Sequence, residues 1–486
     1  MKQLLLALVV ACATHAADKP NIILILADDL GYGDLGCYGH PTIRTPNLDR
    51  MAAEGMRFTD FYSAAEVCTP SRAALLTGRY PIRSGMCHDK FRVLRNVSTG
   101  CLPAEEVTLA ELLKEQGYAT ACVGKWHLGV WTNNPAGHPK NHGFEFYFGL
   151  PHSNDMDPTG PRPKNEDSQE NPDPKWWKAP LFDGEKLIEQ PADQTQLTRR
   201  YAEKSVEFIK AHKSEPFFLY FASTFPHTPL FASEKFKGKT ARGRYGDVVE
   251  ELDWAVGQIL DTLRAEALVK NTFVFFTSDN GPWLIRGLAG GSAGLLRDGK
   301  GSTWEGGMRV PGIARWPGKI PEGKVCHDVA TSMDLLPTIA KFAGVEVPKD
   351  RELDGANIAT LLTDPEGPKT TGGVNWTSMR ARVTTVTNGT TARPAREVFC
   401  YYRGTELFAA RLGPWKAHFL TQTGYGVPKP EPHDPPLLFN LEADPGESYE
   451  CGADHPDVIA KIKAAVEKHK ASLKPVKNQL IETVAK

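Results

Sequence analysis

The sequence predicts an α/β protein with a largely parallel sheet, followed by a smaller α+β region. Two observations carry this prediction. Short continuous apolar runs, typical of strands buried on both faces of a parallel sheet, alternate with helical segments, at residues 21–27, 118–123, 216–222 and 272–277. Polar or charged side chains follow each run at its carboxyl end. Open α/β sheets bind ligands at that edge, so the pattern predicts one shared crevice.

The chain has 486 residues, enough for two or three average domains or one large domain with an appendage. Hydrophobic residues make up 41% and charged residues 24%, which is ordinary for a globular protein. The formal net charge is -1, so the sequence indicates no basic surface and no nucleic-acid partner.

Residues 1–17 have the features of an export signal: Lys2 supplies a positive region and Leu4–Ala11 an apolar core. We therefore expect an exported protein, periplasmic or extracellular in a bacterial host and lysosomal or secreted in a eukaryotic one. The residues before Cys12 also resemble a bacterial lipobox, which would make the protein a lipoprotein; plain secretion is preferred because Cys12 comes early. No later run is long enough for a transmembrane segment.

The chain contains nine cysteines. With Cys12 in the signal and Cys68 set aside for chemistry, an odd number remains, so full disulfide pairing is impossible. We predict a bridge between Cys87 and Cys101 across one loop. No C-x-x-C spacing is present, which argues against a zinc site made of thiolates.

The first apolar run, Asn21–Ala27, ends in Asp28 and Asp29. Adjacent carboxylates repel each other unless a cation lies between them, so this pair favours a metal site over a simple polar turn. A helix is expected further on, over Thr45–Gly55, and it leads towards the next motif.

The segment Cys68–Tyr80 predicts a helix that begins at a reactive group. Pro70 suits the first turn, and the hydroxyl of Thr69 would cap it. Cys68 therefore lies at a helix N-terminus, where unpaired N–H groups favour an anion, and Arg72 lies one turn further on the same face. This arrangement indicates an anion site with a nucleophile in it, whereas an isolated C-x-P sequence would more often mark a buried structural cysteine.

The second apolar run, Tyr118–Val123, follows a helix expected over Val107–Gln116 and leads to Lys125 and His127. In an extended segment these two side chains point to the same side. A cation beside an imidazole suits binding an anion and moving a proton, although a solvated lysine with a structural histidine explains the pattern equally well.

Residues Phe148–Asp155 include Ser153, and a long polar stretch then continues to about Pro180. Long loops in compact domains are usually functional or mobile. Within this stretch, Trp176 and Trp177 would either stack on sugar rings or pack against the domain.

The third and fourth runs, Pro216–Ala222 and Thr272–Thr277, each follow a predicted helix. The third leads to His227, which alone would usually be structural, and the fourth leads to Asp279 and Asn280. Because the ends of parallel strands share one edge of a sheet, the polar groups after all four runs can converge on one crevice. The carboxylate and amide oxygens suit Ca²⁺ or Mg²⁺ rather than zinc.

Gly290–Gly307 is a glycine-rich segment. Its G-x4-G-K sequence mimics a phosphate-binding loop, but the next residue is glycine instead of serine or threonine, and no strand leads directly to a helix here, so a nucleotide site is rejected. We expect the loop to carry Lys300 over the crevice instead.

From about residue 346 to residue 486 the pattern changes to a smaller α+β region, so the main α/β domain is expected over residues 18–345. A threonine-rich, low-complexity insertion at about 369–396 is expected to be mobile. Short strands and a final amphipathic helix are expected at Val398–Tyr402, Leu407–Arg411, Trp415–Leu420 and Val458–Leu473.

Several motifs together resemble those of the type I, formylglycine-dependent sulfatases, in the arylsulfatase A-like branch. They are LADDLGYGDLGCYG at Leu26–Gly39, CTPSRAALLTGRYPIRSGM at Cys68–Met86, GKWHLG at Gly124–Gly129, GLLRDGKGSTWEGGMRVP at Gly294–Pro311 and LFNLEADPGE at Leu438–Glu447. The resemblance implies an alkaline-phosphatase-like α/β fold, with a mixed, largely parallel sheet between helices and a smaller C-terminal α+β subdomain.

The resemblance also implies a modified residue and a metal ion. Cys68 would be oxidised to formylglycine (3-oxoalanine) by a formylglycine-generating enzyme that reads C-x-P-x-R, and its hydrate would attack sulfur. One Ca²⁺ would bind an oxygen of that hydrate and the sulfate, together with the side chains of Asp28, Asp29, Asp279 and Asn280.

The remaining roles follow from the same resemblance. Arg72 would orient the hydrate, and Lys125 and Lys300 would bind sulfate oxygens. His227, with Lys300, would help protonate the leaving alcohol. His127 would remove a proton from the second hydroxyl and so expel sulfate, and Ser153 matches a serine near the formylglycine.

The substrate implied is a sulfate ester, either an aryl sulfate or a sulfated carbohydrate, and the export signal and polar loop favour a sulfated glycan. Two alternatives stay open. One is a phosphodiesterase or phosphonate monoester hydrolase on the same fold, and the other is a non-catalytic protein that binds sulfated glycans.

Overall fold

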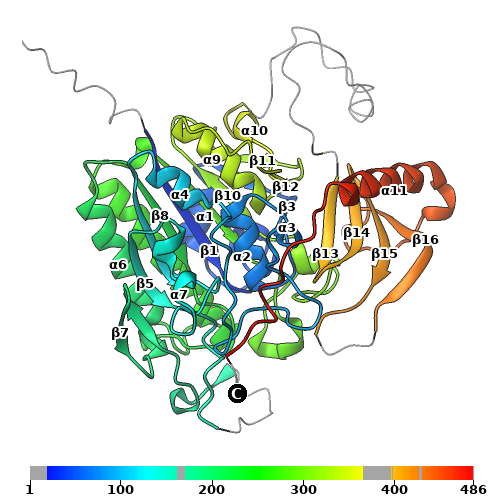
Figure 1. The fold of residues 1–486 in the computed structure, drawn as a ribbon. Coiled ribbons are helices and arrows are strands. Elements are labelled where there is room, and N and C mark those ends of the chain that lie inside the picture. Colours follow the sequence, from blue (N-terminus) through cyan, green and yellow to red (C-terminus); the bar gives the residue numbers. More distant parts are fainter. Residues whose placement is uncertain (1–18, 161–169, 365–395, 397, 426–428, 485–486) are drawn as a thin grey trace, which may run out of the picture.

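The computed structural model describes residues 19–160, 170–364, 396, 398–425 and 429–484 (Figure 1). The expected export signal with Cys12, and the insertion at about 369–396 apart from Arg396, lie outside these residues. Among the described helices, none is both long enough and apolar enough to cross a membrane.

A ten-stranded mixed sheet forms the centre of the larger part of the molecule. Its middle strands run parallel, in the spatial order β9 (Thr272–Ser278), β1 (Asn21–Ala27), β8 (Phe217–Ala222), β4 (Ala119–Lys125) and β5 (Phe146–Leu150). The four predicted buried strands are all present in this parallel group, so the central expectation about the fold is confirmed.

Shorter strands extend the sheet on both sides. Beyond β9 lie β10 (Gly312–Arg315), β2 (Met56–Phe58) and β11 (Lys324–Cys326), and beyond β5 lie β6 (Leu181–Asp183) and β7 (Lys186–Glu189). β10, β6 and β7 pair antiparallel to their neighbours, which makes the sheet mixed. A separate pair joins β3 (Phe61–Tyr62) to β12 (Ala330–Thr331).

Successive residues of a strand point to opposite faces of the sheet, and both sets are buried in the central strands. Helices therefore cover both faces. One face packs against α2 (Cys68–Thr77), α4 (Leu109–Lys114) and α9 (Leu335–Ala343). The other face packs against α1 (Pro46–Ala53), α6 (Leu197–Ala211) and α7 (Arg244–Ala265). The shorter helices of this part are α3 (Pro81–Ser84), α8 (Glu305–Met308) and α10 (Ala359–Thr363).

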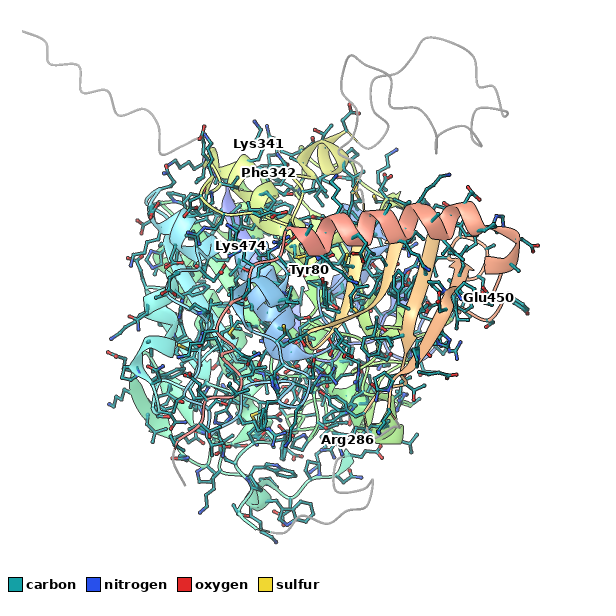
Figure 2. All side chains as sticks on the ribbon, turned by 45° about the vertical axis from the view of Figure 1, so that its right-hand side comes forward. Tyr80, Arg286, Lys341, Phe342, Glu450 and Lys474 are labelled. Atoms are coloured by element: carbon teal, nitrogen blue, oxygen red, sulfur yellow. The ribbon has the colours of Figure 1, made fainter. Side chains whose placement is uncertain are left out.

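A four-stranded antiparallel sheet forms the smaller, C-terminal part, with α11 (Pro456–Ala471) packed on it. Its strands are β13 (Phe399–Arg403), β14 (Glu406–Leu412), β15 (Trp415–Thr421) and β16 (Glu431–Asn440). The predicted meander is confirmed, but its fourth strand, β16, was missed. Tyr80 lies where the two parts meet and packs against Phe399, Tyr402 and His469 (Figure 2).

The chain after α11 returns to the larger part (Figure 1). There the N–H of Gln479 donates to the carbonyl of Gly85 at 2.9 Å, and Leu480 is buried in the larger core. Leu361 and Leu362 of α10 are buried in that core as well. The domain boundary at residue 346 stays a prediction.

Two local predictions were wrong. The helix α2 begins at Cys68 itself, so Thr69 lies inside its first turn and does not cap it. The Thr69 hydroxyl instead donates to the carbonyl of His127 at 3.1 Å and accepts from the N–H of Leu94 at 3.1 Å. It therefore ties the start of α2 to the loop after β4.

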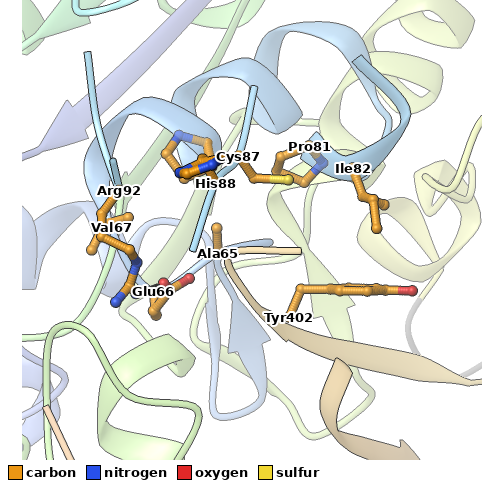
Figure 3. Close-up of a pocket in the computed structure, with 11 residues that line it drawn as sticks. Ala65, Glu66, Val67, Pro81, Ile82, Cys87, His88, Arg92 and Tyr402 are labelled. Carbon is orange, nitrogen blue, oxygen red and sulfur yellow. Dashed lines mark ion pairs between the residues drawn. The ribbon is translucent and has the colours of Figure 1, made fainter. Parts of the chain in front are cut away.

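The predicted bridge between Cys87 and Cys101 is also absent, and both thiols are free. Cys87 lines a pocket with Pro81 and Tyr402 (Figure 3). Cys101 instead packs against Gly129. A Cβ added to Gly129 would lie only 2.9 Å from the Cβ of Cys101. The two cysteines have different surroundings, so no loop-closing bridge forms.

Candidate active site

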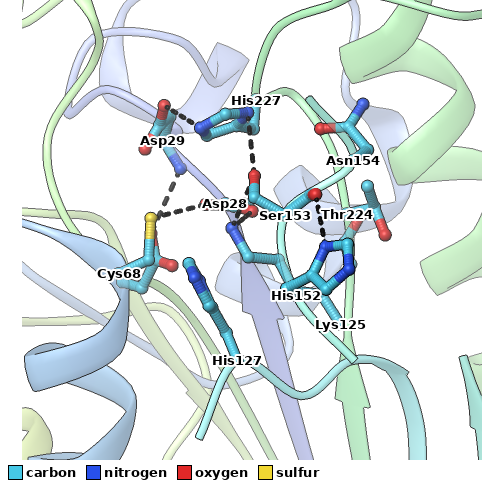
Figure 4. Close-up of polar contacts among 12 residues, drawn as sticks. Asp28, Asp29, Cys68, Lys125, His127, His152, Ser153, Asn154, Thr224 and His227 are labelled. Carbon is cyan, nitrogen blue, oxygen red and sulfur yellow. Dashed lines mark hydrogen bonds and ion pairs between the residues drawn. The ribbon is translucent and has the colours of Figure 1, made fainter. Parts of the chain in front are cut away.

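The carboxyl ends of four parallel strands meet in one buried polar cluster, as the sequence predicts (Figure 4). This convergence follows from parallel pairing, which places the residues after neighbouring strands at one edge of the sheet. The side chains come from Asp28 and Asp29 after β1, Lys125 at the end of β4, His227 after β8, and Asp279 and Asn280 after β9.

Cys68 enters this cluster from the first residue of α2. Its Sγ lies 3.4 Å from Oδ1 of Asp28 and 3.5 Å from Nζ of Lys300. Burial, reinforced by the charge of Asp28, raises the pKa of the Cys68 thiol well above its ordinary value. An unmodified Cys68 would therefore stay protonated at neutral pH, and the thiolate is the form of cysteine that acts as a nucleophile.

Arg72 lies one turn along α2 with its guanidinium fully buried. Its Nε and Nη2 contact Oδ2 of Asp279 at 3.0 and 2.9 Å, and its Nη1 donates to the carbonyl of Lys125 at 2.6 Å. Such a planar fork holds two strand ends in a fixed relation. Arg72 thus connects the helix of Cys68 to β4 and β9.

The three carboxyl groups of the cluster differ strongly in acidity. Burial alone would raise the pKa of Asp28, but Lys125, His227 and Arg72 hold it well below its usual range. Burial and the charge of Asp28 raise the pKa of Asp29, against the opposing effect of Lys300. The same two causes raise the pKa of Asp279 to about 7. A cation among them would favour the ionised form of all three.

The donor set fits a hard divalent cation. One carboxylate oxygen each from Asp28, Asp29 and Asp279, and Sγ of Cys68, lie within 4.8 Å of one another. Asn280 adds an amide whose Nδ2 donates to Asp29 at 2.7 Å, while its buried Oδ1 has no hydrogen-bond partner among the described residues. Carboxylate and amide oxygens are the ligands that Ca²⁺ and Mg²⁺ prefer.

Lys125 and Lys300 lie on different sides of this acidic group. Nζ of Lys125 pairs with Asp28 and donates to Oγ of Ser153 at 3.3 Å. Nζ of Lys300 lies 2.6 and 2.8 Å from the two oxygens of Asp29. Both lysines are buried, so their charges are poorly screened and attract an anion strongly.

His227 presents one ring nitrogen to the cluster. Its Nδ1 lies 2.5 Å from the carbonyl of Thr228 and 3.4 Å from Oγ of Ser153, while Nε2 lies 3.7 Å from Asp29. Because a carbonyl can only accept, Nδ1 carries the proton. Nε2 is then the nitrogen that faces Asp29 and the rest of the cluster.

His127 lies near Cys68 (Figure 4), but the backbone that carries it is not extended as predicted. The N–H of Trp126 and of His127 bond to the carbonyls at the end of β5, and the φ angle of His127 is +60°. Its Nε2 lies 2.8 Å from the carbonyl of Leu94, and its buried Nδ1 has no partner among the described residues. Burial and the charges of Lys125 and Arg72 lower its pKa well below the ordinary value, which leaves a neutral ring with a free lone pair.

Comparison with known proteins decides the family. The sulfatase family model matches residues 20–345, and the model for the C-terminal region of aryl-sulfatase matches residues 394–485. The chain belongs to the sulfatase family. The resemblance of its motifs to sulfatases is thereby confirmed.

Individual relatives agree with this assignment. Arylsulfatase A of Bos taurus is 43% identical over 468 residues, covering 91% of this chain and 85% of that protein. N-acetylgalactosamine-6-sulfatase of Sus scrofa is 40% identical, covering 96% of this chain and 89% of that protein. A sulfatase structure from Pseudoalteromonas sp. has a TM-score of 0.75 at 27% identity, covering 94% of this chain and 91% of that one.

The sulfatase therefore has the alkaline-phosphatase-like fold of its family and is a sulfuric ester hydrolase that acts on a sulfate ester. Phosphoryl transfer on the same fold is not favoured, because the named relatives are sulfatases.

The sequence pattern missed one strand and one aromatic residue near the site. β5, a short run with no polar residue, was not recognised as a strand, although it places Ser153 beside Lys125. Trp283, whose ring lies 5.3 Å from that of His227, carried no signal at all. The paired tryptophans that did stand out are less central, since Trp177 is only 1% exposed and packs against Phe231.

Proposed function

We propose that this sulfatase hydrolyses its ester through a formylglycine made from Cys68, in a site that also holds one Ca²⁺. The observation that carries the proposal is the position of Cys68, at the N-terminus of α2 and between Asp28 and Lys300. No other described cysteine lies within such a group of carboxylates and lysines.

The sequence around Cys68 matches the C-x-P-x-R pattern read by a formylglycine-generating enzyme, which would be a partner during maturation. When present, the hydrated formylglycine supplies an oxygen nucleophile and a second hydroxyl that allows sulfate to leave by elimination. The raised pKa of the unmodified thiol supports the need for this change, because the thiol itself would be a poor nucleophile.

Ca²⁺ would be held by oxygens of Asp28, Asp29, Asp279 and Asn280, and when bound it supplies positive charge beside the reacting sulfuryl group. Two observations support this assignment. Oδ1 of Asn280 has no hydrogen-bond partner in the part of the chain that the structure describes, and burial beside Asp28 raises the pKa of Asp29 and Asp279. Arg72 contributes by holding Asp279 and the end of β4 in place.

The lysines would bind the sulfate. Lys125 and Lys300 approach the cluster from two sides and would each donate to sulfate oxygens. A sulfuryl group in transfer carries negative charge on its oxygens, so fixed cations around it stabilise the transition state. Oγ of Ser153 accepts from Nζ of Lys125 and lies 3.4 Å from the protonated Nδ1 of His227, so Ser153 would keep both side chains aligned.

Two histidines would handle the protons. In the neutral ring Nε2 of His227 carries no proton, and burial and the charge of Lys300 lower the pKa of His227 well below its ordinary value. His227 would therefore help Lys300 protonate the leaving alcohol only after Nε2, which faces Asp29, has taken up a second proton. The lone pair on Nδ1 of His127 would accept a proton from the hydroxyl of the nucleophile, since the carbonyl of Leu94 fixes the other nitrogen as the donor.

The substrate is proposed to be a sulfated carbohydrate, within the broader class of aryl and sugar sulfates. The names of the relatives include both an arylsulfatase and an N-acetylgalactosamine-6-sulfatase. The proposed export signal at residues 1–17 would direct the protein to a compartment where extracellular glycans are met.

The test compares hydrolysis of 4-nitrophenyl sulfate by the wild type and by Cys68→Ala, both made with a formylglycine-generating enzyme and assayed with Ca²⁺. Peptide mass spectrometry establishes whether Cys68 has become the aldehyde. Activity that depends on the converted residue supports the proposal. Equal activity in both proteins would overturn it, and hydrolysis of 4-nitrophenyl phosphate alone would establish phosphoryl chemistry.

A further inference from the structure

We propose that Trp283 and Tyr425, one from each part of the molecule, form a subsite for the cyclic leaving group of the sulfate ester. This inference rests on the proposed function, since it uses the proton donors assigned there. It concerns the aromatic side chains that lie next to His227 and Lys300.

Trp283 lies directly against both proton donors. Its ring is 5.3 Å from that of His227, and Nζ of Lys300 lies 4.5 Å from the centre of the Trp283 ring. The oxygen of the leaving alcohol must come within hydrogen-bond reach of His227 and Lys300 to receive a proton. The carbon skeleton attached to that oxygen therefore meets the indole as it leaves the sulfate pocket.

Tyr425 extends this aromatic surface from the other domain. It follows β15, and its ring centre lies 5.7 Å from that of Trp283. The loop is held in place, because the N–H of Gly424 donates to Asp298 at 3.0 Å and an added Cβ on Gly301 would lie only 3.1 Å from the Tyr425 ring. Each part of the molecule thus contributes one ring to an aromatic surface beside His227.

The chemistry of this pair suits a ring with one apolar face and polar edges. Aromatic faces attract the C–H face of a sugar or the plane of an aryl group. The indole Nε1–H of Trp283 is buried and has no hydrogen-bond partner among the described residues, so it is available to a hydroxyl or carbonyl of the leaving group. The guanidinium carbon of Arg286 lies 3.9 Å from the centre of the Trp283 ring and borders the same surface. The aromatic pair selects the group that carries the sulfate.

The experiment measures kcat and KM for three sulfate esters with wild type, Trp283→Leu and Tyr425→Leu. The esters are N-acetylgalactosamine 6-sulfate, 4-nitrophenyl sulfate and ethylene glycol monosulfate, an acyclic ester of a primary alcohol. Released sulfate is measured by ion chromatography. Trp254→Leu is the matched control, because Trp254 is a half-buried tryptophan of α7 that contacts Phe236.

We expect each variant to lose about 10-fold in kcat/KM, mainly through KM, on a cyclic ester and to keep wild-type kinetics on the acyclic one. A lower kcat/KM on the sugar ester identifies a carbohydrate ring as the leaving group that the subsite binds. A lower kcat/KM on the aryl ester alone identifies an aryl leaving group. The control should match the wild type on all three.

Two results would overturn the inference. One is unchanged kinetics on every ester, and the other is an equal fall in kcat on all three, which would mean that Trp283 only positions His227. If Trp283→Leu folds poorly, Trp283→Phe takes its place in the test. This variant keeps an aromatic ring and should recover most of the lost kcat/KM on a cyclic ester. Wild-type hydrolysis of any ester leaves the proposed function intact in either case.

Discussion

Within the described residues, two buried clusters of charge have the same formal composition. Each has three carboxylates and three cationic side chains. The active-site cluster contains Asp28, Asp29, Asp279, Arg72, Lys125 and Lys300. The second, here called the junction cluster, lies where the two parts of the molecule meet and contains Asp60, Glu305, Glu447, Arg309, Arg411 and Lys416.

In the junction cluster, the charged groups pair with one another and with neighbouring hydroxyls. Glu305 accepts from Tyr62 at 2.5 Å, from Tyr401 at 2.9 Å and from Lys416 at 3.0 Å. Lys416 also lies 2.9 Å from Glu447. Burial alone would raise the pKa of Glu305, but Lys416 and the neighbouring arginines lower it to about 2. A carboxylate so well paired stays ionised and holds α8 to the smaller sheet.

The active-site cluster leaves groups unpaired. Among the described residues, Oδ1 of Asn280 and Nδ1 of His127 have no partner, and the pKa of Asp279 is raised to about 7 by burial and Asp28. Buried polar groups are normally satisfied, so such exceptions call for a ligand. Equal charge counts therefore do not mean equal roles: the charges of the junction cluster pair with one another, whereas the active-site cluster leaves groups that the proposed cation and sulfate would engage.

Removing one lysine from each cluster gives the largest contrast. Lys300→Met should lower kcat for 4-nitrophenyl sulfate by about 100- to 1000-fold, because a fixed cation next to the transferring group is lost. Steady-state kinetics on protein with converted Cys68 measure this. More than a tenth of wild-type activity would show that Lys300 does not contact the reacting group.

The equivalent change at the junction should act on stability. Lys416→Met leaves Glu305 and Glu447 without a buried cation, and breaking a buried pair in this way costs about 3–5 kcal/mol. Urea unfolding measures the change. Lys349→Met, at a fully exposed lysine, is the control and should unfold like the wild type. Equal stability of both variants would mean that the junction cluster does not hold the two parts together.

Removal of the proposed Ca²⁺ should affect the active-site cluster alone. Treatment with EDTA should abolish activity and destabilise the fold by about 3 kcal/mol if Ca²⁺ is supplied at about 100 times its dissociation constant. The thermal unfolding midpoint with and without Ca²⁺ measures the second effect. Asp279→Asn should remove most of the Ca²⁺-dependent shift, whereas Asp60→Asn, at the junction, should keep it. A midpoint insensitive to Ca²⁺ would contradict the metal assignment.

The two clusters also differ in how well sequence reveals them. The strand ends at Asp28, Lys125 and Asp279 were predictable, because each follows an apolar run and parallel pairing brings such ends together. Glu305 and Lys416 were not, since single charged residues far apart in the chain look like solvated surface until the fold places them side by side. Trp283 was missed for the same reason, because its place beside His227 depends on how the fold brings the two loops together.

The smallest expected effect tests one hydroxyl in the junction cluster, that of Tyr62, which donates to Glu305 and accepts from Arg411. Tyr62→Phe removes the hydroxyl that donates to Glu305, at a cost of about 2 kcal/mol for a bond to a charged acceptor. Tyr118→Phe is the matched control, because the buried Tyr118 hydroxyl has no partner among the described residues, and its loss should cost nothing.

The pH dependence identifies the partner of that bond. Because the folded-state pKa of Glu305, about 2, lies below its ordinary value of 4.5, its ionised form stabilises the fold above pH 4.5, and that contribution is lost as the pH falls through about 2. Tyr62→Phe raises the folded-state pKa, so its deficit in unfolding free energy should be full at pH 7 and shrink below about pH 3. A deficit that stays constant with pH would mean that Tyr62 stabilises the junction by packing and not through the charge of Glu305.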